Sequence, residues 1–316
     1  MTKPPSYADL ISQAVSQYRA GTPAAGLTPL AIAAEHYPEN LGTILRWQLH
    51  FTASLGQSEE TLRLLSQALD DGYWFTEDTL RSADFATLQG NPTFETLIAR
   101  CEEMRAAAQA RAKPDRIVLE PQNVSPPHPL LLALHGNNDN ATITSSYWQP
   151  ALSLGWLVGV LQSSQVTGFS PNTFVWTDIP WASREVKAHY AELKEAYNID
   201  NGRVVIGGFS MGGRVTLDIA FRGDIPVCGF IAVGTSLPED VIEDEALWAA
   251  ARARNLRGYI IIGENDAMAI EGTRRMIELF DERGIPCQAE FHPNLAHDYP
   301  DNFDQSIRRA LAFITT

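Results

Sequence analysis

The chain has 316 residues, of which 45% are hydrophobic and 20% charged, a composition that suits a protein with a sizeable core and excludes a wholly disordered chain. Its formal net charge of -14 leaves no basic surface for phosphates, so nucleic acids and anionic membranes are not expected partners. The first residues, MTKPPSYADL, lack the apolar run of a signal peptide, and no stretch approaches the roughly 18 apolar residues of a membrane span. We therefore expect a soluble, cytoplasmic protein.

Residues 6–111 have the pattern of successive helices. The stretches 42–56 and 58–72 carry apolar residues at intervals of three and four, and they end at Gly56 and Gly72, where helix C-caps often fall. Asn91 followed by Pro92 is typical of a helix start, with asparagine as the N-cap and proline in the first turn. This pattern predicts an all-α domain over residues 1–112.

The helical pieces look like hairpins of about 34 residues, the length of tetratricopeptide repeats. Residues 68–103 resemble the segment that often ends tetratricopeptide-like arrays, although helical hairpins are also common as plain packing modules. The three cysteines, Cys101, Cys228 and Cys287, are odd in number and far apart, which argues against a disulfide framework or a metal motif. Cys101 falls on an apolar helical stripe, so we expect it to be buried by packing.

After residue 113 the sequence period changes from helical to mixed. Branched and apolar runs alternate with amphipathic helices, which predicts an α/β fold with a mainly parallel sheet covered on both faces, an α/β domain over residues 113–316. The expected strands are residues 116–121, 129–136, 155–162, 203–208, 228–234, 256–263 and 287–293.

The stretch GGFSMGG, residues 207–213, follows one of these strands and precedes a predicted helix. It contains G-x-S-x-G, the pattern of a nucleophile elbow, in which a strained serine lies between strand and helix and the glycines allow both to approach closely. The alternative is a glycine-rich turn, but the spacing of dinucleotide sites and the lysine of a P-loop are absent. Ser210 is therefore the candidate nucleophile, whereas the outer glycines, Gly207 and Gly213, receive no role.

A serine nucleophile needs a base, and the base needs an acid to orient it. Asp266 follows an apolar strand and His297 lies in a later loop, so the chain order is serine, acid, histidine. Asp266 could instead cap a helix, and Glu264 is a rival acid. His292, at the end of a strand, is a rival base, and Asp298 could be only a surface neighbour of His297.

An oxyanion hole needs two preformed N-H donors. The backbone N-H of Met211, at the start of the predicted helix, supplies the first donor. The second is expected from the loop after residues 129–134, where His135 and Gly136 are followed by Asn137.

Residues from about 116 onward resemble the α/β-hydrolase superfamily, and within it the phospholipase/carboxylesterase and dienelactone-hydrolase-like group. The resemblance rests on LHGNND (134–139), GGFSMGG (207–213) and AHDYP (296–300). It implies an α/β-hydrolase fold, a catalytic triad of Ser210, Asp266 and His297, and oxyanion donors at Asn137 and Met211. It says nothing of the helical extension, which stands where the family has a short N-terminal strand.

The expected function is that of a serine carboxylesterase, acting on small or medium acyl esters through an acyl-enzyme and without a metal or organic cofactor. The segment FVWTD (174–178) resembles part of the family's acyl pocket, and Phe174, Trp176 and Trp181 are the expected pocket residues. A thioesterase or peptidase with the same triad is an alternative. Another is a helical interaction protein with the hydrolase domain as scaffold; the extension could bind a protein partner or a second copy.

Overall fold

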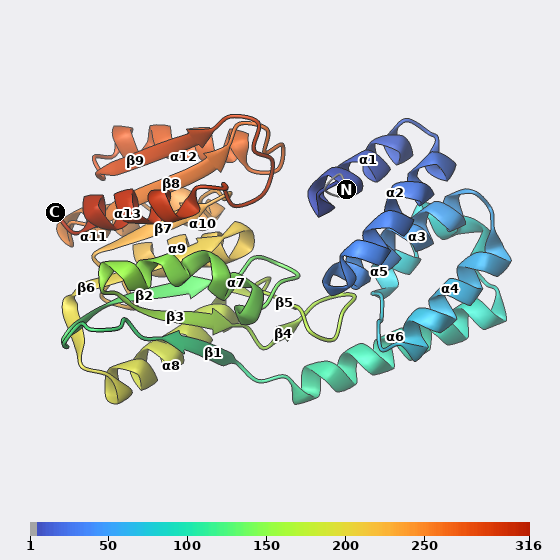
Figure 1. Ribbon diagram of the computed structural model, residues 1–316, viewed down its shortest axis with the longest axis horizontal. Coiled ribbons are helices and arrows are strands. Elements are labelled where there is room, and N and C mark those ends of the chain that lie inside the picture. Colours follow the sequence, from blue (N-terminus) through green and yellow to red (C-terminus); the bar gives the residue numbers. More distant parts are fainter. Residues whose placement is uncertain (1–4) are drawn as a thin grey trace. The chain divides into compact units, whose positions relative to one another are not determined.

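The structure is a computed structural model that describes residues 5–316 (Figure 1). The chain folds into two compact units. The first runs up to Ala112 and also includes Val166–Pro171, and the second comprises Lys113–Gln165 and Asn172–Thr316. The division falls where the sequence pattern changes, but six residues that the sequence places in the α/β domain belong by their packing to the helical unit.

In the helical unit α1 packs on α2, α2 on α3 and α3 on α4, whereas α4 and α5 both pack on α6. Gly56 and Gly72 have positive φ angles of 70° and 90° just beyond two helices, and Asn91 accepts hydrogen bonds from the N-H groups of Thr93 and Phe94, so the predicted caps are confirmed. The elements are α1 (Tyr7–Arg19), α2 (Pro23–His36), η1 (Pro38–Asn40), α3 (Leu41–Ser54), α4 (Ser58–Asp70), α5 (Glu77–Leu80), η2 (Ala83–Leu88) and α6 (Pro92–Arg111).

Two apolar clusters form the core of this unit. One joins α1, α2 and α3, and the other joins α3, α4, η2 and α6 around the fully buried Phe75, Phe85 and Phe94. Cys101 is fully buried in the second cluster, as expected. The helices therefore bury their apolar stripes against one another, while the tetratricopeptide-like resemblance stays a prediction.

The second unit is a seven-stranded sheet with helices on both faces, the α/β-hydrolase architecture predicted from the sequence (Figure 1). Its strands are β1 (Asp115–Leu119), β2 (His128–Leu134), β3 (Leu157–Gln162), β6 (Ile199–Phe209), β7 (Gly229–Val233), β8 (Arg257–Gly263) and β9 (Cys287–His292). Two short strands outside this sheet, β4 (Gln165–Val166) and β5 (Phe174–Val175), pair with each other.

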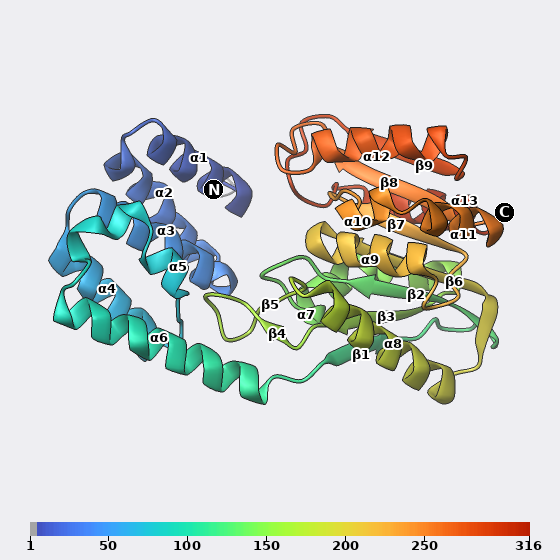
Figure 2. The ribbon, with the colours of Figure 1, turned by 180° about the vertical axis from the view of Figure 1, so that it is seen from behind.

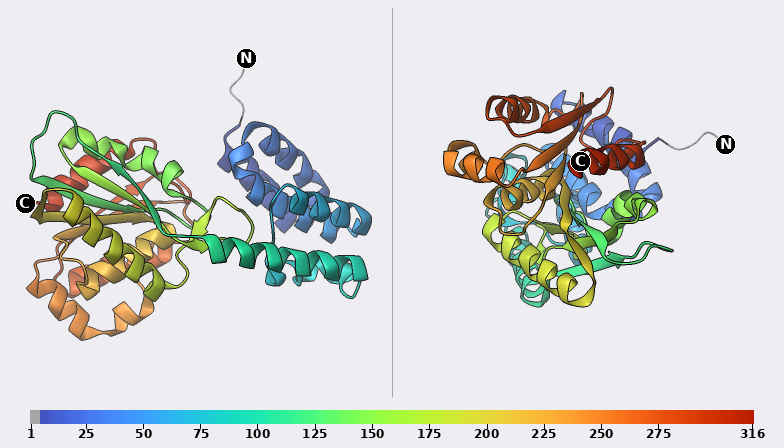
Figure 3. Two further views of the ribbon diagram at one scale, coloured as in Figure 1. Left: turned by 90° about the horizontal axis from the view of Figure 1, so that it is seen from below. Right: turned by 90° about the vertical axis from the view of Figure 1, so that its left-hand side faces the viewer.

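The strand order is β1-β3-β2-β6-β7-β8-β9, and all neighbours are parallel except β1 and β3. The sheet twists progressively from β1 to β9 (Figure 3). After β2 the chain first adds β3 on one side and then β6 on the other, so β2 and β6 flank a topological switch point. Their carboxyl ends meet, since Leu134 lies opposite Gly208 in the register. Ligands bind at such edges in open α/β sheets.

Each face of the sheet has its own apolar core. α7 and α13 cover the face seen in Figure 1, and α8, α9, α11 and α12 cover the face seen in Figure 2. The strands contribute alternate residues to the two cores, as buried parallel strands do. The helical elements are α7 (Ala141–Trp148), η3 (Gln149–Leu154), α8 (Ile179–Ala196), α9 (Ser210–Arg222), α10 (Glu239–Glu243), α11 (Glu245–Ala253), α12 (Ile270–Glu282) and α13 (Phe303–Ile314).

Within residues 5–316, no helix combines the length and the apolar character that a membrane span requires. The same residues hold no group of three or more His, Cys, Asp or Glu side chains that could bind a metal ion.

Candidate active site

Ser210 lies at the point where β6 ends and α9 begins. Its φ angle is 53°, in the left-handed region that non-glycine residues rarely adopt. Such strain persists only where the surroundings fix it, and it is typical of functional turns. Met211 is in the first turn of α9, where backbone N-H groups have no intrahelical acceptor. The serine hydroxyl and a free donor are thus presented together at the carboxyl end of β6.

The glycines around Ser210 are required by close contacts with three other elements. A methyl group at Gly212 would lie 2.2 Å from the carbonyl oxygen of His135. One at Gly207 would lie 2.5 Å from the ring of Trp148, and one at Gly213 would lie 2.7 Å from Thr235 Cγ2. The two outer glycines therefore have a packing reason that the sequence did not reveal.

The structure brings Ser210, His297 and Asp266 together in a chain of two hydrogen bonds. His297 Nε2 is 2.8 Å from Ser210 Oγ, and His297 Nδ1 is 2.7 Å from Asp266 Oδ2. A carboxylate only accepts hydrogen bonds, so His297 carries its proton on Nδ1. Nε2 is then free to accept the serine proton.

Asp266 is only 1% exposed and uses both of its carboxylate oxygens. Oδ2 faces His297, while Oδ1 accepts hydrogen bonds of 3.0 Å from the backbone N-H groups of Met268 and Ala269. Asp266 therefore bonds the histidine and also the turn before α12, but it is not the helix cap that the sequence offered as an alternative, since the N-cap of α12 is Ala269. The backbone donors hold the carboxylate in position beside the histidine.

The alternative acid and base candidates, Glu264, His292 and Asp298, differ from Asp266 and His297 in their exposure and hydrogen bonds. Glu264 is exposed, and His292 is 3.2 Å from Glu290 on the same strand. Asp298 is exposed and accepts the backbone N-H of Tyr299 at 2.7 Å. Only His297 among these residues has a hydrogen bond to Ser210 within residues 5–316.

The loop after β2, residues 135–140, runs beside the serine. A methyl group at Gly136 would lie 2.8 Å from the Phe209 ring and 3.7 Å from Ser210 Cβ. The predicted donor, Asn137, is the next residue, and its side-chain Oδ1 accepts the backbone N-H of Trp176 at 3.1 Å. Asn138 has a positive φ of 62°, a second strained position at this edge. We call residues 135–140 the oxyanion loop.

His135 holds the first residues of this loop in place through hydrogen bonds of its ring. Its Nδ1 is 2.6 Å from the carbonyl oxygen of Gly136, which can only accept, so Nδ1 carries the proton and Nε2 accepts the N-H of Ser163. The ring is completely buried, and burial lowers its pKa from 6.5 to about 4. His135 is therefore neutral and structural.

This pKa predicts acid sensitivity. Protonating His135 costs more free energy in the folded chain than in the unfolded chain. The neutral ring therefore contributes its full stabilisation above about pH 6.5, and this stabilisation is lost as the pH falls toward 4. We expect a loss of about 3 kcal/mol in the free energy of unfolding over this range. Denaturant titrations at several pH values should show that His135→Gln flattens the slope and that His292→Gln does not. Equal slopes in all three proteins would contradict this assignment.

Of the three predicted pocket residues, Trp176 requires a correction. It has no exposed surface, because its ring packs 4.8 Å from that of His135 and its indole N-H donates to the His135 carbonyl oxygen at 2.9 Å. It supports the oxyanion loop and cannot contact a substrate in this conformation. Phe174 and Trp181 are half-buried, and their place in a pocket stays a prediction.

Sequence reasoning missed three further residues at the site. The Phe209 ring lies 4.9 Å from the His297 ring and 4.7 Å from that of Tyr299. Gly234, which directly follows β7 and has a φ of 56°, lies beside the histidine, because a methyl group there would be 3.5 Å from His297 Cε1. The glycine that ends the apolar run of β7 was a possible signal, since it stands at the same sheet edge as Ser210.

Two family models match this chain. Residues 6–109 match the "A/B hydrolase-like, N-terminal domain" model, and residues 175–309 match the "Dienelactone hydrolase family" model. The dienelactone hydrolase match covers less than half of the chain. The matched segment contains the serine, the histidine and the aspartate described above, and it follows the segment that matches the N-terminal domain model.

Among solved structures, an uncharacterized protein from Bacillus cereus ATCC 10987 is 27% identical, with a TM-score of 0.56 over 98% of this chain and 99% of that one. The carboxylesterase of Bacillus cereus is 15% identical, with a TM-score of 0.52 over 66% of this chain and 99% of that chain, a likeness of fold. The first of these shows that both parts of the chain occur together in another protein.

A curated relative is the bifunctional acetylxylan esterase/xylanase XynS20E of Neocallimastix patriciarum. It is 37% identical over 103 residues, which are 31% of this chain. The match spans only 14% of the relative's length.

Proposed function

We propose that this protein is a carboxylic ester hydrolase in which Ser210 is the nucleophile, His297 the general base and Asp266 the residue that orients the histidine. The single observation that supports this most is the unbroken chain of hydrogen bonds from the Ser210 hydroxyl through His297 to a buried carboxylate. Its setting at the carboxyl edge of a dienelactone hydrolase sheet adds to this support.

In the proposed mechanism, Ser210 Oγ attacks the ester carbonyl carbon while His297 Nε2 takes the hydroxyl proton. The charge on the carbonyl oxygen is met by the backbone N-H groups of Met211 and Asn137. When the tetrahedral adduct collapses, the alcohol leaves with the proton from His297 and the acyl group stays on Ser210. A water molecule then gives its proton to Nε2 and attacks the acyl carbon, and the proton returns to Ser210 Oγ as the acid leaves.

The expected substrates are esters with small or medium acyl groups. A panel of p-nitrophenyl esters from acetate to laurate should show activity that falls at the longer chains, as expected of an acyl site for small or medium groups. A fluorophosphonate probe should label the protein once, and mass spectrometry of the digested protein should find the adduct on Ser210. Absence of both labelling and turnover would contradict the proposal.

The same catalytic groups could cleave a thioester or a peptide, so matched thioester and peptide substrates belong in the panel. Acetylated xylan fragments also belong there, because a relative of part of this chain is named as an acetylxylan esterase. A thioester or peptide that is hydrolysed at least about tenfold faster than every ester would move the assignment to that class while keeping the triad.

A further inference from the structure

The strap, which we define as Val166–Pro171, leaves the α/β unit between β4 and β5 and packs as part of the helical unit. Phe169 is only 8% exposed and belongs to the same apolar cluster as Phe75 and Phe85. The α3 helix accommodates it at Gly42, where a methyl group would lie 3.1 Å from both the Phe169 carbonyl oxygen and Ser170 Cβ. The helical core is therefore completed by a residue from the middle of the hydrolase sequence.

Polar contacts fix the strap on the N-terminal side of Phe169. The indole N-H of Trp74 donates to the Thr167 carbonyl oxygen at 3.0 Å, a buried hydrogen bond. The backbone N-H of Val166 donates to Gln109 Oε1 at 3.1 Å, from the last turns of α6. Because both bonds hold the strap's backbone, they fix its path as well as its side chains.

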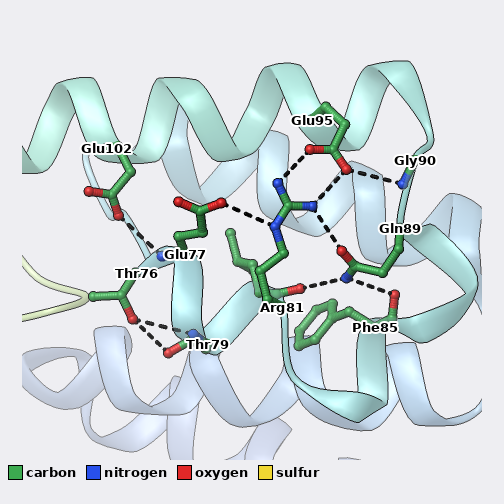
Figure 4. Close-up of polar contacts among 10 residues, drawn as sticks. Thr76, Glu77, Thr79, Arg81, Phe85, Gln89, Gly90, Glu95 and Glu102 are labelled. Atoms are coloured by element: carbon green, nitrogen blue, oxygen red, sulfur yellow. Dashed lines mark hydrogen bonds and ion pairs between the residues drawn. The ribbon is translucent and has the colours of Figure 1, made fainter.

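The strap packs beside the first residues of α5, and an ionic cluster around Arg81 holds that helical turn (Figure 4). A methyl group at Gly168 would lie 2.9 Å from Thr76 Cγ2, and Thr76 is the N-cap of α5. Arg81, at the other end of α5, bonds Glu77 at 3.2 Å and Glu95 at 2.6 and 2.7 Å (Figure 4). The α5 turn is thus tied to α6, and the strap packs on a fixed surface.

The residues directly after the strap, 172–176, hold the oxyanion loop through five hydrogen bonds. The backbone N-H of Phe174 donates to Asp139 at 2.9 Å, and its carbonyl oxygen accepts from Asn138 at 2.8 Å. Asn140 Nδ2 donates to the carbonyl oxygen of Asn172. Trp176 makes the last two bonds: its backbone N-H donates to Asn137 Oδ1, and its indole N-H donates to the His135 carbonyl oxygen. Asn140 also caps α7 and Asp139 accepts a hydrogen bond from the Thr144 hydroxyl of that helix, but the bonds named for Asn137 and Asn138 lead to residues 174–176.

We propose that the strap positions the oxyanion loop, so that Phe169 and Trp74 of the helical core are positioning residues for the hydrolase reaction. Residues 166–171 are anchored in the apolar cluster of the helical unit, which limits the conformational freedom of residues 172–176 directly after them. Residues 172–176 in turn bond the loop that carries Asn137. The inference rests on the proposed function, because it assigns the oxyanion donor of that same site.

The physical reason lies in the two strained positions at this edge. Asn138 has a positive φ, and an oxyanion donor must stand within about 0.5 Å of its required place to act. If the strap lost its anchor, residues 172–176 would gain conformational freedom and Asn137 would sample other positions. Substrate would still bind, whereas the tetrahedral adduct would lose a donor, so kcat should fall with little change in KM.

The test compares five full-length variants with the wild type, one of which, Phe169→Leu, keeps an apolar side chain at the anchor position. Phe169→Ala removes the anchor and Trp74→Phe removes the N-H donor to Thr167. Their matched controls stay inside the helical unit: Phe51→Ala removes a ring from the other apolar cluster, and Tyr18→Phe removes the hydroxyl that donates to Asp84. Steady-state kinetics with p-nitrophenyl acetate, inhibition by a trifluoromethyl ketone and hydrogen exchange of peptide 135–140 are measured on each folded protein.

We expect Phe169→Ala to lower kcat about 10- to 100-fold, with KM within about twofold, and to weaken the ketone, which mimics the tetrahedral adduct, by a similar factor. Trp74→Phe should give a smaller effect in the same direction, Phe169→Leu should restore most of kcat, and the controls should match the wild type. Hydrogen exchange at residues 135–140 should quicken only in the strap variants.

The inference is overturned if Phe169→Ala keeps wild-type kcat and wild-type exchange while folded, or if Phe51→Ala changes both as much. If Phe51→Ala does not fold, the inference is tested by comparing Trp74→Phe with its control, Tyr18→Phe. A wild type without esterase activity or probe labelling would defeat the proposed function instead. The exchange data would then still decide whether the strap holds the loop.

Discussion

Replacing Ser210 by alanine is expected to lower kcat for p-nitrophenyl acetate by about 10^5-fold and to abolish labelling by a fluorophosphonate. The variant keeps Met211 and the oxyanion loop but has no oxygen to form the acyl-enzyme, so only the slow direct attack of water remains. The rate should be measured by single-turnover kinetics as well as at steady state, because trace wild-type enzyme would mask a loss of this size.

The matched control is Ser146→Ala, which removes an exposed hydroxyl on α7 that bonds only the carbonyl oxygen of Ile143. It should keep wild-type turnover and labelling. Circular dichroism must show that Ser210→Ala is folded, since its backbone conformation at φ 53° is unfavourable for alanine as well. A folded Ser210→Ala protein that retains more than about 1% of the activity would refute the role of this serine.

Asp266→Asn should lower kcat by about 10^4-fold while leaving the fold intact. The amide can still accept the N-H groups of Met268 and Ala269 through its oxygen. Its nitrogen would then donate to His297 Nδ1 and shift the ring proton to Nε2. That tautomer cannot accept the proton of Ser210, so the base is lost although every heavy atom stays in place.

Asp298→Asn is the matched control, because this carboxylate is next to His297 in sequence but bonds the backbone of Tyr299. Its kcat should lie within about threefold of the wild type. The effect of Asp266→Asn should appear in kcat at every pH where the wild type is active. Equal losses from the two substitutions would mean that the orienting carboxylate was assigned wrongly.

The sequence predicted the seven strands of the sheet and the caps around Gly56, Gly72 and Asn91, because these features follow from local patterns. Apolar runs of five to seven residues encode buried parallel strands, and glycine or asparagine encodes a helix end. The antiparallel direction of β1 and the short strands β4 and β5 were not predictable in this way. Their pairing depends on partners that are remote in sequence.

At the site, the order of Ser210, Asp266 and His297 was readable because the fold brings the carboxyl ends of successive parallel strands to one edge. The role of Trp176 was misread because an aromatic residue beside a loop can line a pocket or support the loop, and only burial distinguishes the two. Phe169 falls within residues 113–316, which the sequence assigns to the α/β domain. Its packing in the helical core is a tertiary choice that no local pattern records.

The strap also has a consequence for how the protein is made. Domains usually fold as units during synthesis, with the N-terminal one first. Here residues up to Ala112 leave the ribosome without Phe169, so the apolar cluster around Phe75 and Phe85 stays open until β1, β2 and β3 have also been translated. The apolar cluster of the helical unit is therefore complete only after about half of the chain has been translated.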